Sequence, residues 1–499
     1  MKCTKNSLGD AKVMKLGSEI FLLVCVVVGW QFCYSAVWHG HPGRVATGSK
    51  PVAQTGKAES AIDGVRFVVE AEEVVTRYTP ADNGAGPLWC YGSTVIARKE
   101  NNVYLSIIET GKDVPLLCNT RWQLWHRSAN GWKIAQSEKE YRQREPCPIA
   151  TFKEGAVFLS VNPSIEPPGV KYGRCRPLVL EFNPDALANA AKIHHPVWAD
   201  GAYFTDHSYR GFAADGANGE LLLLNINAKT GEQFVSYGDS SGKWHQKGKI
   251  EFPIRACYPQ VALRDRSAAV MAIGDIVEPV EEWRKLKFEK LKRQWDYVFR
   301  HLFYTFTPDI LTTDFVAPVE IDTVEKTAGH IQNLDLYIDG AGAAHLLYLK
   351  RPHQYSFIRD KYFPGQAMTV HLEYVIIKGG KVLSRKTLAE TPQGSRGLEP
   401  SYGRFHISSD SALWVIAAGT YTDGAERTFG NYIGRILPGQ SEPIFVRIDL
   451  KHPFRTFFTS TVRGGSEPSD VIDLFGIADD NPNLRYARIR LETGRNQTD

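Results

Sequence analysis

"REPCPIATFKEGAVFLSV", from Arg144 to Val161, has the same pattern as "RACYPQVALRDRSAAVMAIG", from Arg255 to Gly274. Each stretch begins with an arginine and enters a short apolar strand through a Cys–Pro or Cys–Tyr–Pro step. A polar turn and a second apolar strand follow. Apolar runs bounded by Gly, Asp and Ser are typical of β-hairpins. Because the hairpin recurs, we expect a fold built from repeats.

The repeat extends over seven segments of the chain. Each segment places a small or polar residue at the start of an apolar strand, and a turn and a second strand follow it. A second hairpin usually completes the unit. Four strands per unit, about seven units and no long helical stretch predict an all-β, seven-bladed β-propeller. A six-bladed propeller and two packed β domains are the alternatives. The aligned residues are Cys90, Cys147, Ser208, Cys257, Gln332, Ser401 and Ser469.

The seventh unit is short of strands, because the chain ends soon after Ser469. An open ring of sheets would leave unpaired strand edges. The stretch "VRFVVEAEEVV", residues 65–75, reads as a strand and lies before the first unit. We therefore expect it to supply the missing outer strand and close the ring.

The N-terminal segment predicts export. Lysines precede the apolar run "IFLLVCVVVGW", from Ile20 to Trp30, which is short for a membrane span but fits the core of a signal peptide. With cleavage near Ser35–Ala36, residues 1–36 form a signal peptide, and an uncleaved membrane anchor is the alternative. Residues 37–62 form a flexible linker and residues 63–499 the propeller. The expected location is secreted or periplasmic.

Composition narrows the range of partners. The chain has 499 residues, 43% of them hydrophobic and 23% charged, as in a folded globular protein. A net charge of +4 provides no global field for nucleic acid, so we expect no nucleic-acid partner. Membrane contact is expected only through the N-terminal segment, and the protein is expected to be a monomer.

No cofactor motif occurs. Ca²⁺ is conceivable at "IADDNPN", residues 477–483, but this stretch does not define a ligand set.

Five cysteines remain after the expected cleavage, so at least one is free or pairs between chains. The spacing from Cys90 to Cys118 equals that from Cys147 to Cys175. Each of these pairs is predicted to link the inner strand of a blade to its own inter-strand loop, although pairing between adjacent blades is equally allowed. Zinc is not expected, because close Cys and His ligand pairs are absent from the sequence. The fifth cysteine is Cys257.

A single face of the propeller should carry the site. Loops that enter the inner strands gather there around the central channel, together with loops between second and third strands. Clustered arginines can hold a carboxylate or sulfate, and Tyr and His beside Arg can remove a proton α to a uronate carboxylate. A carboxylate pair can run acid/base glycoside chemistry. The alternative is that these residues are polar only because the mouth of the channel is exposed to water, and not because they bind a ligand. The candidate catalytic residues are Arg144, Glu145, His207, Tyr209, Arg255, Tyr258 and Tyr402.

One insertion predicts a helix. The stretch "EPVEEWRKLKFEKLKRQWDYVF", residues 278–299, reads as a short basic helix with one apolar side. We expect it to cap the pocket, and a helix packed on the rim for stability is the alternative. The apolar positions are Trp283, Leu286, Phe288, Leu291 and Trp295.

Two hairpins resemble the Asp-box (BNR) turn of sialidase-like propellers. They are "SANGW", residues 128–132, and "SYGDSSGKW", residues 236–244, in which Asp239, Gly242 and Trp244 fit the pattern loosely. The resemblance implies a structural turn on the outer part of a blade. The stretches "RHLFYTFTPDI" and "KHPFRTFFTSTVRGGSEPSD" are similar to uncharacterised exported bacterial propellers, which implies no function.

Sialidases also need an arginine triad. Arg144, Arg255 and Arg463 can form one by position, although no early Arg-Ile-Pro motif occurs. Likeness of fold does not carry function.

The sequence thus leads to three functional hypotheses. The first is an exported propeller that recognises a glycan, as a hydrolase or lyase of an acidic polysaccharide. The alternative is a non-catalytic propeller of the cell surface that binds carbohydrate or protein. The third is a structural surface protein. Whether the protein is an enzyme is left open by the sequence.

Overall fold

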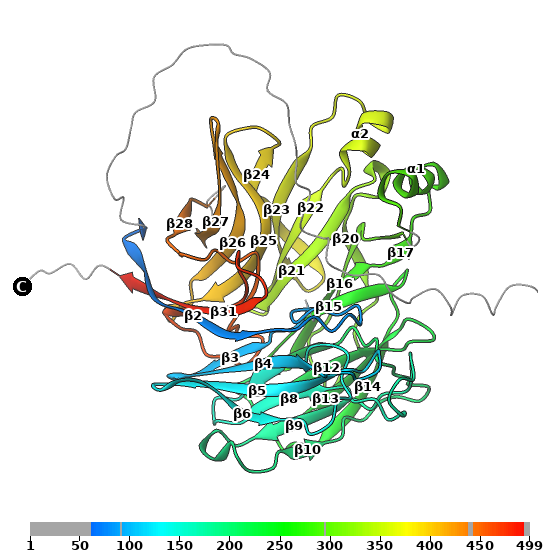
Figure 1. The fold of residues 1–499 in the computed structure, drawn as a ribbon, viewed down its shortest axis with the longest axis vertical. Helices are drawn as coiled ribbons and strands as arrows, with labels where there is room; N and C mark the ends of the chain where they lie inside the picture. The colour runs from blue at the N-terminus through cyan, green and yellow to red at the C-terminus, as the bar shows by residue number, and fades with distance from the viewer. Residues whose placement is uncertain (1–60, 90–91, 294–295, 438–442, 494–499) are drawn as a thin grey trace, which may run out of the picture.

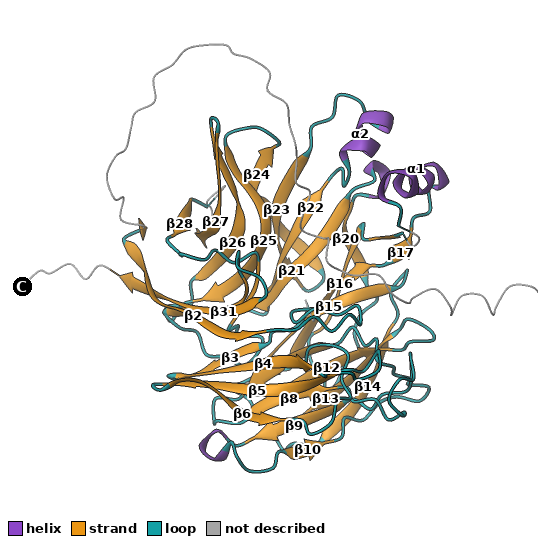
Figure 2. Cartoon of the chain, in the orientation of Figure 1, coloured by secondary structure: helices purple, strands orange, loops and turns teal. Residues whose placement is uncertain are grey.

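Seven antiparallel sheets form a closed ring in the computed structural model (Figure 1). The structure describes residues 61–89, 92–293, 296–437 and 443–493. Each innermost strand contacts the innermost strand of the next blade, and that of the seventh blade contacts that of the first. The seven-bladed all-β propeller predicted from the repeats is confirmed, and helices are confined to the periphery (Figure 2).

Six blades consist of four strands each, named here in chain order from the innermost outward; in blade 4 the hairpin of β17 (Ile276–Val277) and β18 (Tyr297–Val298) interrupts this order. Blade 1 is β3 (Ile96–Lys99), β4 (Asn102–Thr110), β5 (Thr120–Ser128) and β6 (Gly131–Ser137); blade 2 is β7 (Ile149–Thr151), β8 (Val157–Val161), β9 (Leu178–Phe182) and β10 (Lys192–His194). Blade 3 is β11 (Gly211–Asp215), β12 (Glu220–Ile226), β13 (Gln233–Gly238) and β14 (Trp244–Ile250); blade 4 is β15 (Ala256–Arg264), β16 (Ser267–Gly274), β19 (His301–Thr307) and β20 (Val319–Thr323). Blade 5 is β21 (His330–Ile338), β22 (Ala344–Arg351), β23 (Thr369–Lys378) and β24 (Lys381–Pro392); blade 6 is β25 (Gly397–Ile407), β26 (Leu413–Asp423), β27 (Glu426–Ile436) and β28 (Phe445–Ile448).

Blade 7 joins the two ends of the described chain. It consists of β29 (Thr456–Thr459), β30 (Val471–Ile477), β31 (Asn483–Thr493), β2 (Val65–Arg77) and β1 (Ala61–Ile62). Strand β2 pairs with β31 from Val65 opposite Thr493 to Arg77 opposite Asn483, as the ring-closure prediction requires. Strand β1 lies within the range predicted as linker. The predicted signal segment, residues 1–36, lies outside the described residues.

The repeat alignment is wrong in the seventh unit. In the first six units the aligned residue lies in the inner strand or a few residues before it, but Ser469 precedes β30, the second strand of blade 7. The true inner strand, β29, has only four residues, and a loop separates it from β30. A strand this short carries too weak a pattern to be aligned.

The inner strands of the blades are buried on both faces, because each blade is packed between two neighbours. Every residue of β12, "ELLLLNI", is buried, and so is all of β16 except its first residue. This explains why the sequence shows continuous apolar runs here rather than a polar–apolar alternation. The core therefore lies between the blades.

The outer hairpin of blade 3 is a tight turn held by Asp239. Asp239 Oδ1 accepts hydrogen bonds from the backbone N–H groups of Ser241 at 2.9 Å and Lys243 at 3.0 Å. Gly242 has a φ of 80°, which favours glycine, and Trp244 is buried. The turn connects β13 to β14 and is structural.

A buried ion pair fills the central channel. The Nε of Arg463 donates to Asp335 Oδ1 at 2.8 Å, and its Nη1 donates to the carbonyl of Gly92 at 2.9 Å. Its Nη2 donates to Gln260 Oε1 at 3.1 Å. Asp335 Oδ2 also accepts from the backbone N–H of Phe405 at 2.9 Å. One guanidinium and one carboxylate thus connect blades 1, 4, 5, 6 and 7.

The predicted helical insertion contains α1 (Glu281–Leu291) between the short strands β17 (Ile276–Val277) and β18 (Tyr297–Val298). It packs on α2 (Ser356–Tyr362) at one edge of the molecule (Figure 1), which agrees with the rim alternative. The apolar side is narrower than predicted, because Phe288 is 51% exposed. Trp295 lies outside the described residues.

Within the described part of the chain, neither α1 nor α2 has the length and apolar character needed to cross a membrane. The remaining helical segments are the single 3₁₀ turns Pro184–Ala186 and Glu325–Thr327.

Replacing Arg463 by Ala should destabilise the propeller strongly. Asp335 is fully buried, and breaking a buried ion pair typically costs about 3–5 kcal/mol because it leaves an uncompensated charge. Urea unfolding followed by far-UV circular dichroism measures the loss. Lys285→Ala is the control, since its solvent-exposed pair with Glu281 contributes little to stability. Equal effects of the two substitutions would contradict a structural role for the buried pair.

Candidate functional site

Six of the seven predicted residues come together on one face. Arg144 and Glu145 precede β7, His207 and Tyr209 precede β11, and Arg255 and Tyr258 lie at the start of β15. The His207 ring stacks on Trp89 with 5.3 Å between centroids and lies 4.3 Å from the Tyr209 ring. A small cavity between these side chains has room for little more than one water molecule. It is lined by Trp89, Gly92, Glu145, Tyr209, Arg210 and Tyr258.

Glu145 is a buried anchor beneath the site. Its Oε1 accepts from the backbone N–H of Ser208 at 3.1 Å, and its Oε2 accepts from the Ser208 hydroxyl at 2.7 Å. Burial works against ionisation, but hydrogen bonding to His207 and the charges of Arg144 and Arg210 leave the pKa of Glu145 lowered. Its carboxylate therefore supports the neighbouring blade rather than facing a ligand.

His207 is suited to accept a proton. Its side chain is 25% exposed, and Nδ1 lies 3.4 Å from both Glu145 Oε1 and Arg144 Nη1. Burial, together with Arg144, lowers the pKa of His207 although Glu145 opposes the shift, so the ring is neutral at neutral pH. A proton on Nδ1 directed at the carboxylate makes the stronger, charge-assisted hydrogen bond. That tautomer leaves Nε2 as the acceptor.

Tyr209, Arg255 and Asp275 form the second half of the site. Arg255 Nη1 lies 3.2 Å from Asp275 Oδ2, and its guanidinium lies 5.5 Å from the centroid of the Tyr209 ring. The Tyr209 hydroxyl donates to Asp275 at 3.5 Å. Burial and Asp275 raise the pKa of Tyr209 well above its usual value, so the phenol keeps its proton. The Arg255 side chain is 36% exposed, which makes it available to an anion.

Two of these tyrosines are held in strained backbone conformations. Tyr209 has a φ of 39° and Tyr258 a φ of 50°, in the left-handed region that bulky residues avoid at a cost of about 1–3 kcal/mol each. The β15–β16 register shifts between Cys257 and Gln260, and Asn333 Nδ2 donates to the Tyr258 carbonyl at 2.7 Å. The two rings lie 4.8 Å apart. Such outliers cluster at functional sites, which supports this one.

Sequence reasoning missed Trp89 and Asp206. Trp89 lies between β2 and β3, and its ring contacts those of His207, Tyr209 and Tyr258. Asp206 lies 3.9 Å from Arg144, and burial raises its pKa to about 6. The sequence offered one signal for these two residues: Trp89 directly precedes Cys90 and Asp206 directly precedes His207, each at a predicted blade entry.

The structure does not bring Tyr402 or Arg463 into the site. Tyr402 is 1% exposed, its hydroxyl accepts from Arg404 at 2.6 Å, and its ring packs on Phe457. It belongs to the core between blades 6 and 7. Arg463 is bound to Asp335 in the channel, so an arginine triad with Arg144 and Arg255 is not formed.

The four described cysteines are free thiols. The predicted pair of Cys147 with Cys175 is wrong: Cys147 Sγ lies 3.8 Å from Gln143 Oε1, and Cys175 Sγ lies 3.8 Å from the carbonyl oxygen of Gly173. The segment that precedes Cys175 packs against blade 1, where Pro115 lies against Gly169. Cys90 lies outside the described residues.

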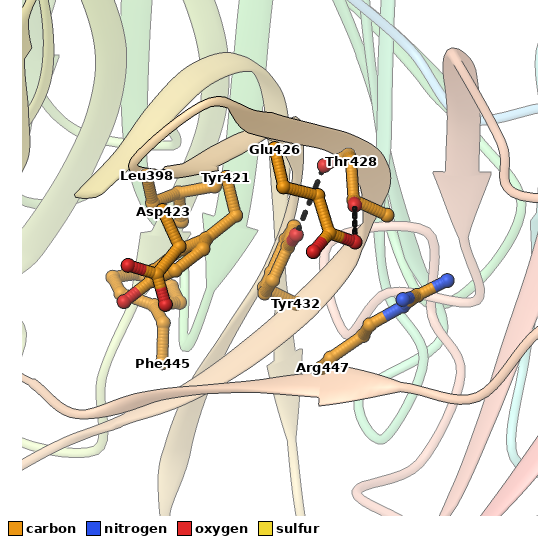
Figure 3. A pocket seen from close by; sticks show the side chains of 8 residues that line it. All are labelled: Leu398, Tyr421, Asp423, Glu426, Thr428, Tyr432, Phe445 and Arg447. Carbon is orange, nitrogen blue, oxygen red and sulfur yellow. Dashed lines mark hydrogen bonds between the residues drawn. The ribbon is translucent and has the colours of Figure 1, made fainter. Parts of the chain in front are cut away.

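A larger hollow of about 400 Å³ lies on blade 6, away from this cluster (Figure 3). It exists because β28 pairs with β27 only from Asn431 to Gly434, so β27 extends beyond its outer partner. Its side chains include two exposed carboxylates and Arg447, but histidine is absent from its lining. The side-chain cluster around the Trp89 cavity combines a base, an acid and a cation, so it is the better candidate for chemistry. The hollow is lined by Leu398, Tyr421, Asp423, Glu426, Thr428, Tyr432, Phe445 and Arg447.

The stretch in which Ca²⁺ was considered contributes to a possible ligand group of His452, Asp479 and Asp480. However, Arg485 donates two hydrogen bonds to Asp480, at 2.8 and 2.6 Å. A guanidinium at this position opposes a divalent cation, so the group fits Ca²⁺ poorly.

Comparisons with known proteins give likeness of fold. No family model and no curated protein matches the chain. A polysaccharide lyase, an ulvan lyase of family PL25 bound to -[GlcA(1-4)Rha3S]-, superposes with a TM-score of 0.49 at 11% identity over 83% of this chain and 95% of that chain. The polysaccharide lyase Uly1 gives 0.45 at 9% identity over 85% and 99%. The Trypanosoma rangeli sialidase gives 0.36 at 11% over 69% and 54%.

Asp206→Asn should stabilise the protein at neutral pH. The raised pKa of Asp206 means that the fold prefers its neutral form. The wild type therefore loses stability as pH rises from about 4 to about 6, and the variant does not. The gain should be roughly 3 kcal/mol above pH 6 and vanish near pH 4. Urea unfolding at both pH values measures it, and parallel stability curves would contradict the buried state of this carboxyl.

Proposed function

We propose that the protein binds an acidic polysaccharide at the Trp89 cavity and cleaves it by β-elimination next to a uronate. The observation that carries this proposal is the placement of a neutral His207 and a protonated Tyr209 between the guanidinium groups of Arg144 and Arg255. These are the groups that elimination needs: a cation for the carboxylate, a base for the α-proton and an acid for the leaving oxygen.

In the proposed reaction Arg255 binds the uronate carboxylate and stabilises the negative charge that develops when C5 loses its proton. His207 Nε2 takes that proton as the C5–H bond breaks. The electron pair forms the C4–C5 double bond, and the C4–O bond breaks. The Tyr209 hydroxyl protonates the leaving oxygen. The products are an unsaturated uronate end and a free hydroxyl on the other fragment, and no water is consumed.

The carboxyl groups favour elimination over hydrolysis. A glycosidase usually needs two carboxyl groups flanking the scissile bond. Here Glu145 is bonded to Ser208 through both oxygens, and Asp206 and Asp275 are each 3% exposed. Glu145 lines the cavity with both carboxylate oxygens already bonded, and Asp206 and Asp275 are not among its lining residues.

A non-catalytic glycan-binding propeller is the second candidate. The narrowness of the cavity between Trp89, Tyr209 and Tyr258 favours it, because a sugar ring must open this space before it reaches His207. Aromatic rings and exposed guanidinium groups also bind sugars and anions without turnover.

The deciding experiment incubates the full chain with uronate-containing, sulfated and sialylated glycans. Unsaturated-uronate absorbance, reducing ends and free sialic acid are followed together. Absorbance that rises in step with reducing ends supports the lyase. New reducing ends without absorbance, or release of sialic acid, would contradict the lyase proposal and show that the protein is a hydrolase. Binding to glycans of the same panel without any product would contradict the lyase proposal and support the non-catalytic glycan-binding propeller.

His207→Ala and Arg255→Ala should each lower kcat/KM by at least about 10²-fold, because they remove the base and the carboxylate partner. Arg427→Ala is the matched control, since Arg427 is half exposed on blade 6 and should leave the rate unchanged. Because the pKa of His207 is lowered, wild-type kcat/KM should stay level down to pH 6.5 and fall only below it. Full activity in His207→Ala with intact circular dichroism would overturn the assigned base.

A further inference from the structure

Two cysteine thiols from neighbouring blades lie together beside the site. Cys118 is in the loop between β4 and β5 of blade 1, and Cys175 is in the loop between β8 and β9 of blade 2. The two loops pack together, since Pro115 lies against Gly169, and the Cys175 thiol is close enough to that of Cys118 to interact with it. The Cys175 Sγ also lies 3.8 Å from the carbonyl oxygen of Gly173. Cys175 is buried, whereas Cys118 is partly exposed. The other described cysteines, Cys147 and Cys257, are completely buried in the core.

The residues that flank Cys118 hold Arg144 in place. The amide of Asn83 donates to the carbonyl of Leu117 at 3.1 Å and to the side-chain oxygen of Asn119 at 2.9 Å. In turn, Arg144 Nε donates to the Asn83 carbonyl at 3.0 Å. The loop that carries Cys118 thus supports Arg144 through a single intervening residue.

The segment around Cys175 holds the chain that carries His207. The Cys175 N–H donates to the carbonyl of Phe204 at 3.0 Å, and the Tyr172 N–H lies 3.4 Å from Asp206 Oδ2. Asp206 directly precedes His207. Each cysteine therefore lies within a few bonds of the backbone that positions one side of the site.

We propose that Cys118 and Cys175 form a disulfide that cross-links blades 1 and 2 and ties the support of Arg144 to that of His207. This cross-link is independent of the proposed lyase reaction. The oxidant is a small-molecule or protein disulfide. Two S–H bonds break and one S–S bond forms, and two electrons and two protons pass to the oxidant, which leaves as two thiols.

The two sulfurs react in a fixed order. The partly exposed Cys118 thiolate attacks the oxidant first, which forms a mixed disulfide and releases one thiol. The interaction with Cys118 and burial raise the pKa of the Cys175 thiol, which disfavours its thiolate as the first nucleophile. Cys175 then attacks the mixed disulfide at Cys118 and releases the second thiol.

Peptide mapping without reduction tests this assignment. The full-length chain is incubated with oxidised glutathione, blocked with iodoacetamide and digested. We expect a Cys118–Cys175 cross-linked peptide about 2 Da lighter than its two thiol peptides together. Cys175→Ser should accumulate glutathione on Cys118, and Cys118→Ser should acquire several-fold less on Cys175. Alkylation of both cysteines in the wild type, or a link from either to another cysteine, would overturn the proposal.

Thermal unfolding supplies a second readout. Reductant should lower the unfolding midpoint of the oxidised wild type by several degrees, because the bond closes a long loop. It should leave Cys118→Ser unchanged, and the control Cys147→Ser should keep the full reductant-dependent shift. An equal shift in Cys118→Ser would contradict the cross-link. If a variant fails to fold, the wild-type peptide map still decides.

Discussion

The pairing of β2 with β31 is the constraint on which the rest of the molecule depends. It closes a ring of seven sheets that would otherwise expose two edges. Because β2 is outside β31 in blade 7 while β3 is innermost in blade 1, the connection between them must travel from the rim to the channel. Its residues 78–89 bring Asn83 and Trp89 onto the face of the site. Closing the ring and building the site are therefore consequences of one topological step.

Buried charges give this face its rigidity. Arg463 and Asp335 fix the channel, while Glu145, Ser208 and Arg210 form a hydrogen-bonded layer behind His207. Burying charges is unfavourable unless each is paired, so such networks tolerate few arrangements of the blades around them. Polar groups fixed in this way need little reorganisation when a charged ligand arrives, which is the arrangement that electrostatic catalysis requires.

The blade number and the clustering of six candidate residues on one face could be predicted, because both follow from the position of each inner strand, which an apolar pattern reveals. The prediction from sequence failed at positions where the apolar pattern does not reveal the position of the inner strand. Strand β29 is too short to show a pattern, and Tyr402 follows a register shift in β25, so its side-chain direction could not be read from spacing. Trp89 belongs to the ring-closing connection rather than to the repeat. The proton states of His207 and Asp206 depend on burial by other blades, which a single stretch of sequence does not encode.

The left-handed backbone at Tyr209 and Tyr258 has a consequence for recognising relatives of this chain. Glycine adopts that conformation without strain, so a chain under selection for folding alone would drift toward glycine at both positions. This chain instead has a phenol at each position, and both rings contact Trp89. In another propeller of this architecture, the residues at the entries of blades 3 and 4 would therefore show whether this aromatic cluster is present or only the scaffold.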